Sequence, residues 1–334
     1  MDMDGLSAQE VTAGMRAQPP IKPRGFALSI IVILVIVLFL DTIAIGLRVY
    51  SKAWLLRKHK VWGLDDTLAV LGFVPWIPAT TYIVLGVFNG IGTKDSELPP
   101  LASGGYFLQL KAAEYLTKWQ LTVVVTIPFV KNAIAVQIMR LTFQRRYRYL
   151  LWFAIFTSTI NAIGGLISVL VHCKPIAATW NPKLGECGSL EPLMKLSYAF
   201  TAVAIMSDCI CAIIPFFFIS KMNMKVRKKW GVIGVLSIGI CACIFTIARV
   251  PYLKYYLIPE DQLYHYGYMC LFTMLEEGVG MIAGCMPSIY KLYSTFYGSL
   301  SDSRTTGRVE AAATIGGTPM DSLTPISKGH IRKA

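Results

Sequence analysis

Long apolar stretches recur along the chain at intervals that suit a bundle of membrane-spanning helices. The first reads ALSIIVILVIVLFL, from Ala27 to Leu40, and carries no charged residue. A helix that crosses the hydrocarbon core of a bilayer needs about 20 mostly apolar residues. Seven stretches meet this requirement, namely residues 26–50, 66–89, 106–139, 150–172, 193–220, 231–257 and 265–290. The pattern predicts an all-α polytopic membrane protein with a seven-transmembrane helix bundle.

The polar segments at both ends set the expected domain organisation. Residues 1–25 are expected to form an extracellular or lumenal N-terminal segment, and residues 26–293 the seven-transmembrane domain. Residues 294–334 are rich in Ser, Thr and Gly, which is typical of disorder. This last segment is therefore predicted to be a disordered cytoplasmic tail.

Basic residues alternate between the loops. Lysine and arginine concentrate in the first, third and fifth loops, as Lys52, Arg57, Lys58, Lys60, Arg140, Arg145, Arg146, Arg148, Lys221, Lys225, Arg227, Lys228 and Lys229. Loops rich in these residues stay in the cytoplasm. We therefore expect the N-terminus outside and the C-terminus in the cytoplasm, in the plasma membrane or the endoplasmic reticulum. The basic loops would then be available to a cytoplasmic signalling partner.

Composition and charge agree with a membrane protein. Apolar residues make up 54% of the chain and charged residues 15%, against about 25% charged residues in soluble domains. The net charge of +13 fits basic loops facing anionic lipid. The chain has no zinc-finger spacing, glycine-rich phosphate loop, HExxH, GxSxG or DDxxD motif. We therefore expect no nucleic-acid partner, no metal and no cofactor.

Two of the eight cysteines fall in the fourth loop, on the predicted outer side. These are Cys173 and Cys187, which are predicted to form a disulfide. Closing a loop of this size stabilises the fold by about 3 kcal/mol in the chain-entropy model. The other six cysteines lie in the predicted spans, where packing is the preferred interpretation over metal binding.

Six charged residues lie deep inside the predicted spans, away from their ends, where a charge costs at least roughly 2.5 kcal/mol at the bilayer centre. They are Asp41, Lys131, Asp208, Arg249, Glu276 and Glu277. With a helix rise of about 1.5 Å per residue, Glu276 lies near the depth of Arg249 and Lys131 near that of Asp208. Asp41 lies at a similar inner depth. The depths predict two ion pairs.

The adjacent glutamates cannot point the same way, because neighbouring helix residues lie about 100° apart. Glu276 shares a stripe with Gly280 and Gly284, which would let another helix approach closely. Glu276 is therefore predicted to face the bundle interior, and Glu277 to border a cavity or a neighbouring helix. Two interpretations stay open: a structural pair of Glu276 with Arg249, or a ligand cavity lined by one of the glutamates.

Two further acids open the second span. Asp65 and Asp66 stand where a carboxylate caps free backbone N–H groups and meets the positive end of the helix dipole. We prefer this capping role over a chemical one.

Five motifs in the same chain carry a resemblance to a known family. They read LRVYSKAWLLRKHKVWGLDDTLAV, VKNAIAVQIMRL, CKPIAATWNPKLGEC, SDCICAIIPFFFISKMNMKVRKKWGVIGVLSIGICACIFTIARVPYL and EEGVGMIAGCMPSIYKLY. Together they resemble the fungal rhodopsin-like seven-transmembrane family, which includes pathogenicity-related receptor-like proteins of filamentous fungi. The resemblance places the family's polar residues at Arg48, Asp65, Asp66, Lys131, Arg140, Asp208, Arg249 and Glu276. Ala133 departs from it, since the family commonly has Ser there.

The resemblance implies a receptor-like binder of a hydrophobic small molecule. It does not imply retinal, because the seventh span has no lysine for a Schiff base and Lys291 follows only at its end. The alternative is a membrane-embedded enzyme or accessory protein of secondary-metabolite biosynthesis, since family members often accompany such genes. Its most concrete form is a metal-free, acid-initiated terpene cyclase with Glu276, Glu277 and Asp208 as catalytic carboxylates. Transport is a third, less favoured class.

The predicted topology is testable with tags. A protease-cleavable tag at residue 5 of expressed protein is expected to be cut from the outer or lumenal side of sealed membranes, because the basic loops hold the opposite face in the cytoplasm. A tag at the C-terminus is the matched control and should be protected. Cleavage of the residue-5 tag from the cytosolic side would contradict the orientation.

Overall fold

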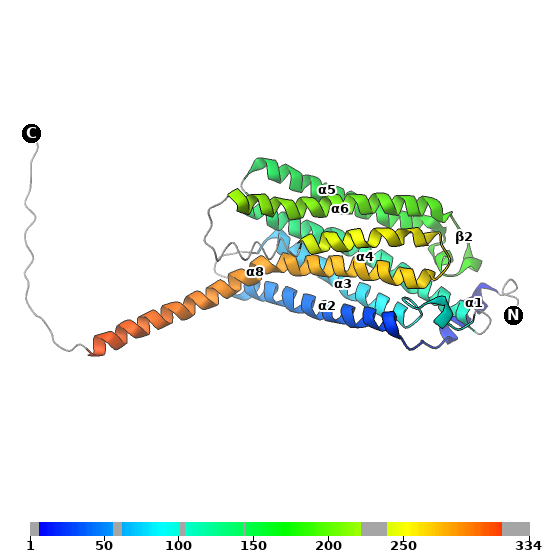
Figure 1. The fold of residues 1–334 in the computed structure, drawn as a ribbon, viewed down its shortest axis with the longest axis horizontal. Helices are drawn as coiled ribbons and strands as arrows, with labels where there is room; N and C mark the ends of the chain where they lie inside the picture. The colour runs from blue at the N-terminus through cyan, green and yellow to red at the C-terminus, as the bar shows by residue number, and fades with distance from the viewer. Residues whose placement is uncertain (1–6, 56–61, 101–103, 143, 222–238, 316–334) are drawn as a thin grey trace, which may run out of the picture. The chain divides into compact units, whose positions relative to one another are not determined.

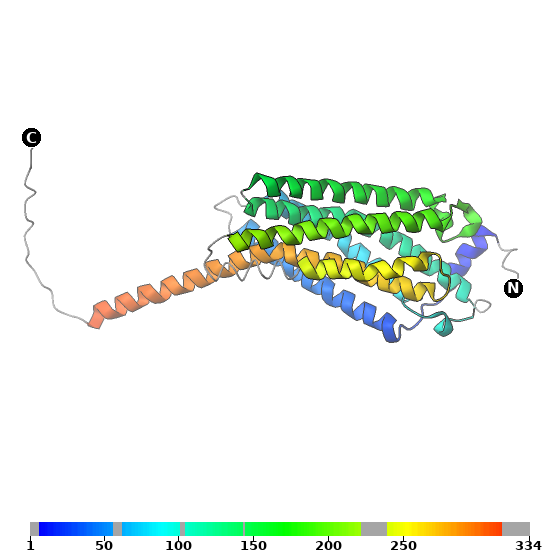
Figure 2. The same cartoon turned by 45° about the horizontal axis from the view of Figure 1, so that its top comes forward.

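The computed structural model describes residues 7–55, 62–100, 104–142, 144–221 and 239–315, and most of them are helical. The long helices are α2 (Gly25–Val49), α3 (Leu64–Val87), α4 (Gly105–Leu141), α5 (Arg145–His172), α6 (Leu190–Lys221) and α8 (Gln262–Ile315). As far as Tyr290, these helices run side by side as one bundle (Figures 1 and 2). The fold class predicted from the sequence is confirmed as all-α and polytopic.

Six helices among the described residues are long and apolar enough to cross a membrane. They are Gly25–Lys52, Leu64–Val87, Gly105–Arg140, Arg145–His172, Leu190–Ile214 and Gln262–Tyr290. They match six of the seven predicted spans. The remaining predicted span, 231–257, begins outside the described residues, and its described part is helical over 239–249. Much of the first and fifth basic loops, residues 56–61 and 222–238, also lies outside the described residues.

The helix surfaces show why the sequence suits lipid. On α2 the buried residues recur every three or four positions, as Ala27, Ile30, Leu34 and Val37. Between them, equally apolar side chains such as Phe39 are exposed. A helix that is apolar on both faces belongs in a bilayer, because one face packs in the bundle while the other meets lipid tails.

The predicted disulfide is present, and it closes a short hairpin. Strand β1 (Cys173–Lys174) pairs antiparallel with β2 (Glu186–Cys187), and Cys173 is bonded to Cys187. The turns between the strands hold the short helices η6 (Ile176–Thr179) and η7 (Pro182–Leu184). We call residues 173–187 the disulfide hairpin.

A short helix that the sequence analysis missed holds this hairpin. Helix α1 (Ala8–Ala17) starts with a capping box, in which the Ser7 hydroxyl and the Glu10 carboxylate each accept a backbone N–H of the other residue. Asn181 of the hairpin donates its amide to the Ala8 carbonyl at 3.1 Å and to Thr12 at 3.2 Å. The Ser-x-x-Glu spacing was the signal that could have revealed α1.

Helix α8 extends into the segment predicted as a tail, and the predicted division of the chain at residue 294 stays a prediction. Helix α8 continues through Ile315, and residues 316–334 lie outside the described part. The first proline after Pro287 is Pro319. A helix that is already formed needs no new nucleus to extend, so a Ser- and Gly-containing segment can continue it.

Close packing of α8 occurs at a glycine other than the two predicted. A Cβ added to Gly278 would overlap the Val37 Cγ1 methyl of α2. At Gly280, by contrast, an added Cβ would lie 3.6 Å from Ile134 Cδ1 of α4, which is an ordinary contact. Gly280 and Gly284 do face α4 as expected, but the tight positions on α8 are Gly278 and Gly267, where an added Cβ would lie 2.8 Å from the Gly92 Cα.

A buried cluster of charges joins the helices at the end opposite the disulfide hairpin. Arg48 of α2 bonds Asp66 and Asp65 of α3, each at 2.8 Å, and the Gly284 carbonyl of α8 at 2.5 Å. It also contacts Gln137 of α4 at 3.3 Å. Arg48 therefore connects four helices.

The two aspartates do more than cap α3. Asp66 Oδ2 accepts the Gly63 N–H at 3.0 Å, which confirms the predicted cap. Both carboxylates are also buried in ion pairs, with Arg48 and, for Asp65, with Arg140. The sequence alone did not predict these ion pairs, because it does not show that Arg48, across the first loop, and Arg140, at the end of the third span, turn toward the same acids.

The Gly278 contact predicts a selective packing defect. Gly278→Ala is expected to destabilise the protein by about 1–3 kcal/mol, because the new methyl overlaps Val37. Gly280→Ala is the matched control and should change stability by less, since its Cβ meets an ordinary contact. Thermal unfolding in detergent measures both, and equal effects would contradict the packing described.

The Arg48 cluster predicts a larger loss. Arg48→Met leaves two buried carboxylates without their main partner and is expected to cost about 3–5 kcal/mol. Lys52→Met is the control, because Lys52 contacts the same Asp66 at 2.9 Å while its own side chain stays 10% exposed. Unfolding temperatures should fall much further for Arg48→Met, and a similar fall for both would count against the cluster.

Candidate functional site

A cavity of about 440 Å³ lies within the bundle. Its wall comes from α4, α5, α6, the 3-10 helix η8 (Val250–Tyr256) and α8, and the disulfide hairpin contributes Cys173, Thr179 and Cys187. Along α4 the lining runs from Ala113 to Lys131, which corresponds to about 27 Å of helix. The cavity therefore extends from the hairpin deep into the bundle.

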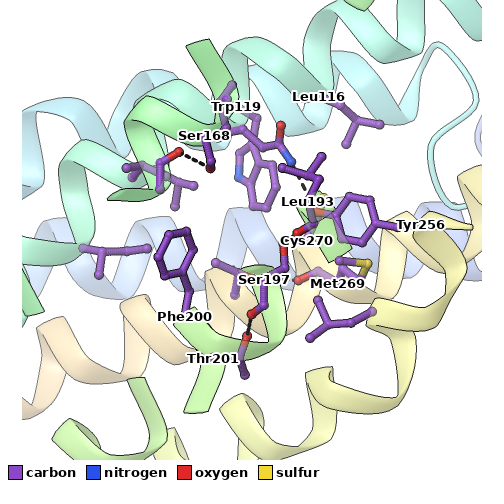
Figure 3. A pocket seen from close by; sticks show the side chains of 18 of the residues that line it. Leu116, Trp119, Ser168, Leu193, Ser197, Phe200, Thr201, Tyr256, Met269 and Cys270 are labelled. Carbon is purple, nitrogen blue, oxygen red and sulfur yellow. Dashed lines mark hydrogen bonds between the residues drawn. The ribbon is translucent and has the colours of Figure 1, made fainter. Parts of the chain in front are cut away.

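Apolar and aromatic side chains dominate the wall. Figure 3 shows Trp119, Phe200, Tyr256 and Met269 around the space, with Leu116 and Leu193. Several wall hydroxyls donate to carbonyls of their own helices, including Ser168 to Gly165 at 2.7 Å and Thr201 to Ser197 at 2.8 Å. Such bonds leave the hydroxyls as weak features of a mostly apolar surface.

Charged residues form the inner end of the cavity, which we call the floor. It consists of Lys131 from α4, Arg249 at the end of the helical residues 239–249, and Glu276 from α8. Lys131 Nζ lies 2.7 Å from Asp208 Oδ1 and 2.9 Å from Glu276 Oε1. The contact of Lys131 with Asp208 agrees with the predicted pair, and the bridge to Glu276 was missed.

The predicted ion pair of Glu276 with Arg249 is present only as a long contact, and Lys131 is the nearer cation. Glu276 is 5% exposed and faces the interior as expected. Arg249 Nη1, however, lies 4.0 Å from its carboxylate and instead donates to Thr273 Oγ1 at 2.9 Å. Thr273 precedes Glu276 by one helical turn and reaches the guanidinium first, so Lys131 is the closer partner of Glu276.

The prediction that Glu277 borders a cavity is wrong for this cavity. Its lining includes Glu276 and not Glu277, because one residue along a helix turns the side chain by about 100°. Glu277 is 2% exposed, and neither of its carboxylate oxygens has a hydrogen-bond partner among the described residues.

The other predicted acids also lie off the cavity. Asp208 borders a separate space of about 40 Å³ together with Lys131. Asp41 is fully buried beside Trp76 and Gly278, away from the cavity lining. Of the six intramembrane charges, Lys131, Arg249 and Glu276 share the cavity, and Asp208 joins them through Lys131.

The α5 wall was missed although the sequence carries a signal for it. Small and polar residues recur at helical spacing on this span, as Ser158, Asn161, Ala162, Gly165 and Ser168, and all of them line the cavity. The opposite face carries large exposed residues such as Phe156 and Ile163. A polar stripe on a membrane helix indicates a face turned from lipid.

Known proteins share sequence with this chain. It is 23% identical over 268 residues to "Fugralins biosynthesis cluster protein 2" of Gibberella zeae, covering 78% of this chain and 64% of that protein. It is 24% identical over 144 residues to a "SAT4 family membrane protein" of Emericella nidulans, covering 41% of this chain and 35% of that protein. The chain thus spans less than two thirds of the length of either relative. No solved structure matches it.

A family model assigns the domain. The model described as the fungal rhodopsin domain matches residues 47–295, which include the Arg48 cluster, the disulfide hairpin and every residue of the cavity floor. This match covers most of the chain, and together with the several apolar helices it identifies a multi-pass membrane protein. The chain belongs to the fungal rhodopsin domain family.

Proposed function

We propose that the protein is a receptor-like membrane protein that binds a hydrophobic small molecule in the bundle cavity. The observation that carries the proposal is the cavity itself. Its volume of about 440 Å³ falls within the range of small-molecule sites, roughly 300–1,000 Å³. An apolar wall with a few charged groups at one end is also typical of such sites.

The chemistry of the site argues against retinal as that ligand. Residues 262–290 of α8 contain no lysine that could form a Schiff base. Lys131 belongs to α4, and its amine is held by two carboxylates at 2.7 and 2.9 Å. An amine in two ion pairs is a poor nucleophile, so a non-covalent ligand fits the cavity better.

A role in biosynthesis is the second candidate, and the name of the Gibberella zeae relative favours it. An acid-initiated cyclase would need a carboxyl group that gives a proton to substrate in the cavity. Within the described residues Glu276 is the one acid on the lining, and it lies within 4.0 Å of two cations. Such pairing suits a structural carboxylate better than a proton donor, so we favour binding of a pathway compound over cyclisation.

The proposal predicts that filling the cavity abolishes binding. Ala162→Phe places a ring in the cavity, and Ile163→Phe is the control because Ile163 is 54% exposed on the lipid side. Farnesol, a neutral C15 lipophile, should raise the unfolding temperature of the unsubstituted protein and of Ile163→Phe in nanodiscs. At 100 times its Kd a ligand stabilises by about 2.7 kcal/mol.

The paired design separates binding from partitioning into lipid. Farnesol dissolved in the bilayer would affect both phenylalanine variants alike, whereas cavity binding should be lost in Ala162→Phe alone. Equal shifts in all three proteins, or no shift in any, would contradict a binding cavity for this class of compound.

A further inference from the structure

We propose that the ligand carries a carboxylate, and that Arg249 at the cavity floor receives it. This inference rests on the proposed binding function and adds the chemistry of the ligand's polar end. It follows from the hydrogen-bond donors that the floor and walls still have available.

Most of the hydrogen-bonding capacity of the Lys131 ammonium group is already used within the protein. Asp208 and Glu276 hold its ammonium group at 2.7 and 2.9 Å, from α6 and α8 respectively. The negative charge of these two carboxylates exceeds the single positive charge of Lys131. Both carboxylates lie closer to Lys131 than to Arg249. The cation of the floor that remains weakly compensated is therefore Arg249.

Arg249 uses few of its donors. A guanidinium carries five N–H donors, and here Nη1 donates to Thr273 at 2.9 Å. Glu276 lies at 4.0 Å, too far for a hydrogen bond. Arg249 Nε is buried without a hydrogen-bond partner in the described part of the chain, while the side chain as a whole is 16% exposed and lines the cavity.

A carboxylate is the group that fits such a guanidinium. Leaving donors of a buried charged group unsatisfied is costly. A carboxylate accepts two parallel N–H bonds from one arginine, so a single ligand group could satisfy the edge that Thr273 and Glu276 leave free.

Among the described wall residues the Ser158 hydroxyl also lacks a partner, but a neutral hydroxyl donates one bond, whereas a guanidinium donates two parallel, charge-assisted bonds to a carboxylate. Trp119 Nε1 contacts Met274 Sδ at 3.3 Å. Gln120 pairs with Tyr256 at 3.5 Å, and Gln262 with Tyr266 at 2.9 Å. These four polar residues bond one another away from the floor, so an anionic group gains most at Arg249.

The competing ligand is an amine. Glu276 lies on the cavity lining, Asp208 lies directly behind Lys131, and Glu277 is a further acid nearby. A cationic group would be attracted to these acids. It would have to displace Lys131 from Glu276, however, whereas a carboxylate at Arg249 displaces no ion pair shorter than 4.0 Å.

The test compares four farnesyl compounds that differ only at the polar end: farnesoic acid, methyl farnesoate, farnesol and farnesylamine. Kd values come from the unfolding temperature in nanodiscs at pH 8.5, and the part that Ala162→Phe abolishes counts as cavity binding. We expect the acid to bind about tenfold or more tighter than the ester and the alcohol, with the amine weakest.

Arg249 variants assign the preference to this residue. Arg249→Gln should bring acid and ester to equal affinity, and Arg249→Lys should keep part of the difference. If Arg249→Gln lowers the folded yield, the affinities of the four compounds for the unsubstituted protein still show whether a carboxylate is preferred.

The outcomes separate the two proposals. Tightest binding of the amine, equal binding of all four compounds, or an acid preference that survives Arg249→Gln overturns the carboxylate site and leaves the binding cavity intact. If Ala162→Phe changes the binding of none of the four, the binding function itself fails.

Discussion

A charge inside a bilayer has to find its counter-charge within the protein, and this constraint organises the bundle. Lys131 meets it by contacting Asp208 of α6 and Glu276 of α8 at once. These three side chains form a charged set. A helix that supplies one of them cannot slide or rotate without separating the charges, because an unpaired charge costs several kcal/mol inside the bundle. Three helices are thereby fixed at one depth.

A second set fixes the helices again nearer the end that carries the basic loops. Arg48 connects α2 to α3, α4 and α8. Helix α4 takes part in both sets through Lys131 and Gln137. Helix α8 does so through Glu276 and Gly284. With these two helices held at two levels, the bundle tolerates a cavity where α5 and α6 face α4, away from the tight contact of Gly278 with α2.

The sequence predicts the parts of this fold that depend on local composition. Apolar length predicted the six described spans, loop position predicted the pair Cys173 and Cys187, and helix rise placed Lys131 at the depth of Asp208. The sequence could not decide whether Lys131 or Arg249 is the closer partner of Glu276, because depth alone does not distinguish two cations on different helices. The sequence left a cavity lined by a glutamate as an open interpretation, but it could not identify the walls, since an apolar wall residue such as Phe200 has the same character as one that faces lipid.

The adjacent glutamates show how one helical step separates two environments. Glu276 lies on the cavity lining, near Lys131 and Arg249, so its charge is already shared between two cations. Glu277, turned off the lining, is buried without a hydrogen-bond partner in the described residues. On the lining, therefore, Glu276 already has two cations beside it, whereas Arg249 keeps donors that a ligand could use. For this reason the spare donors of Arg249, rather than the acids, are the chemical feature of the floor that can select a ligand.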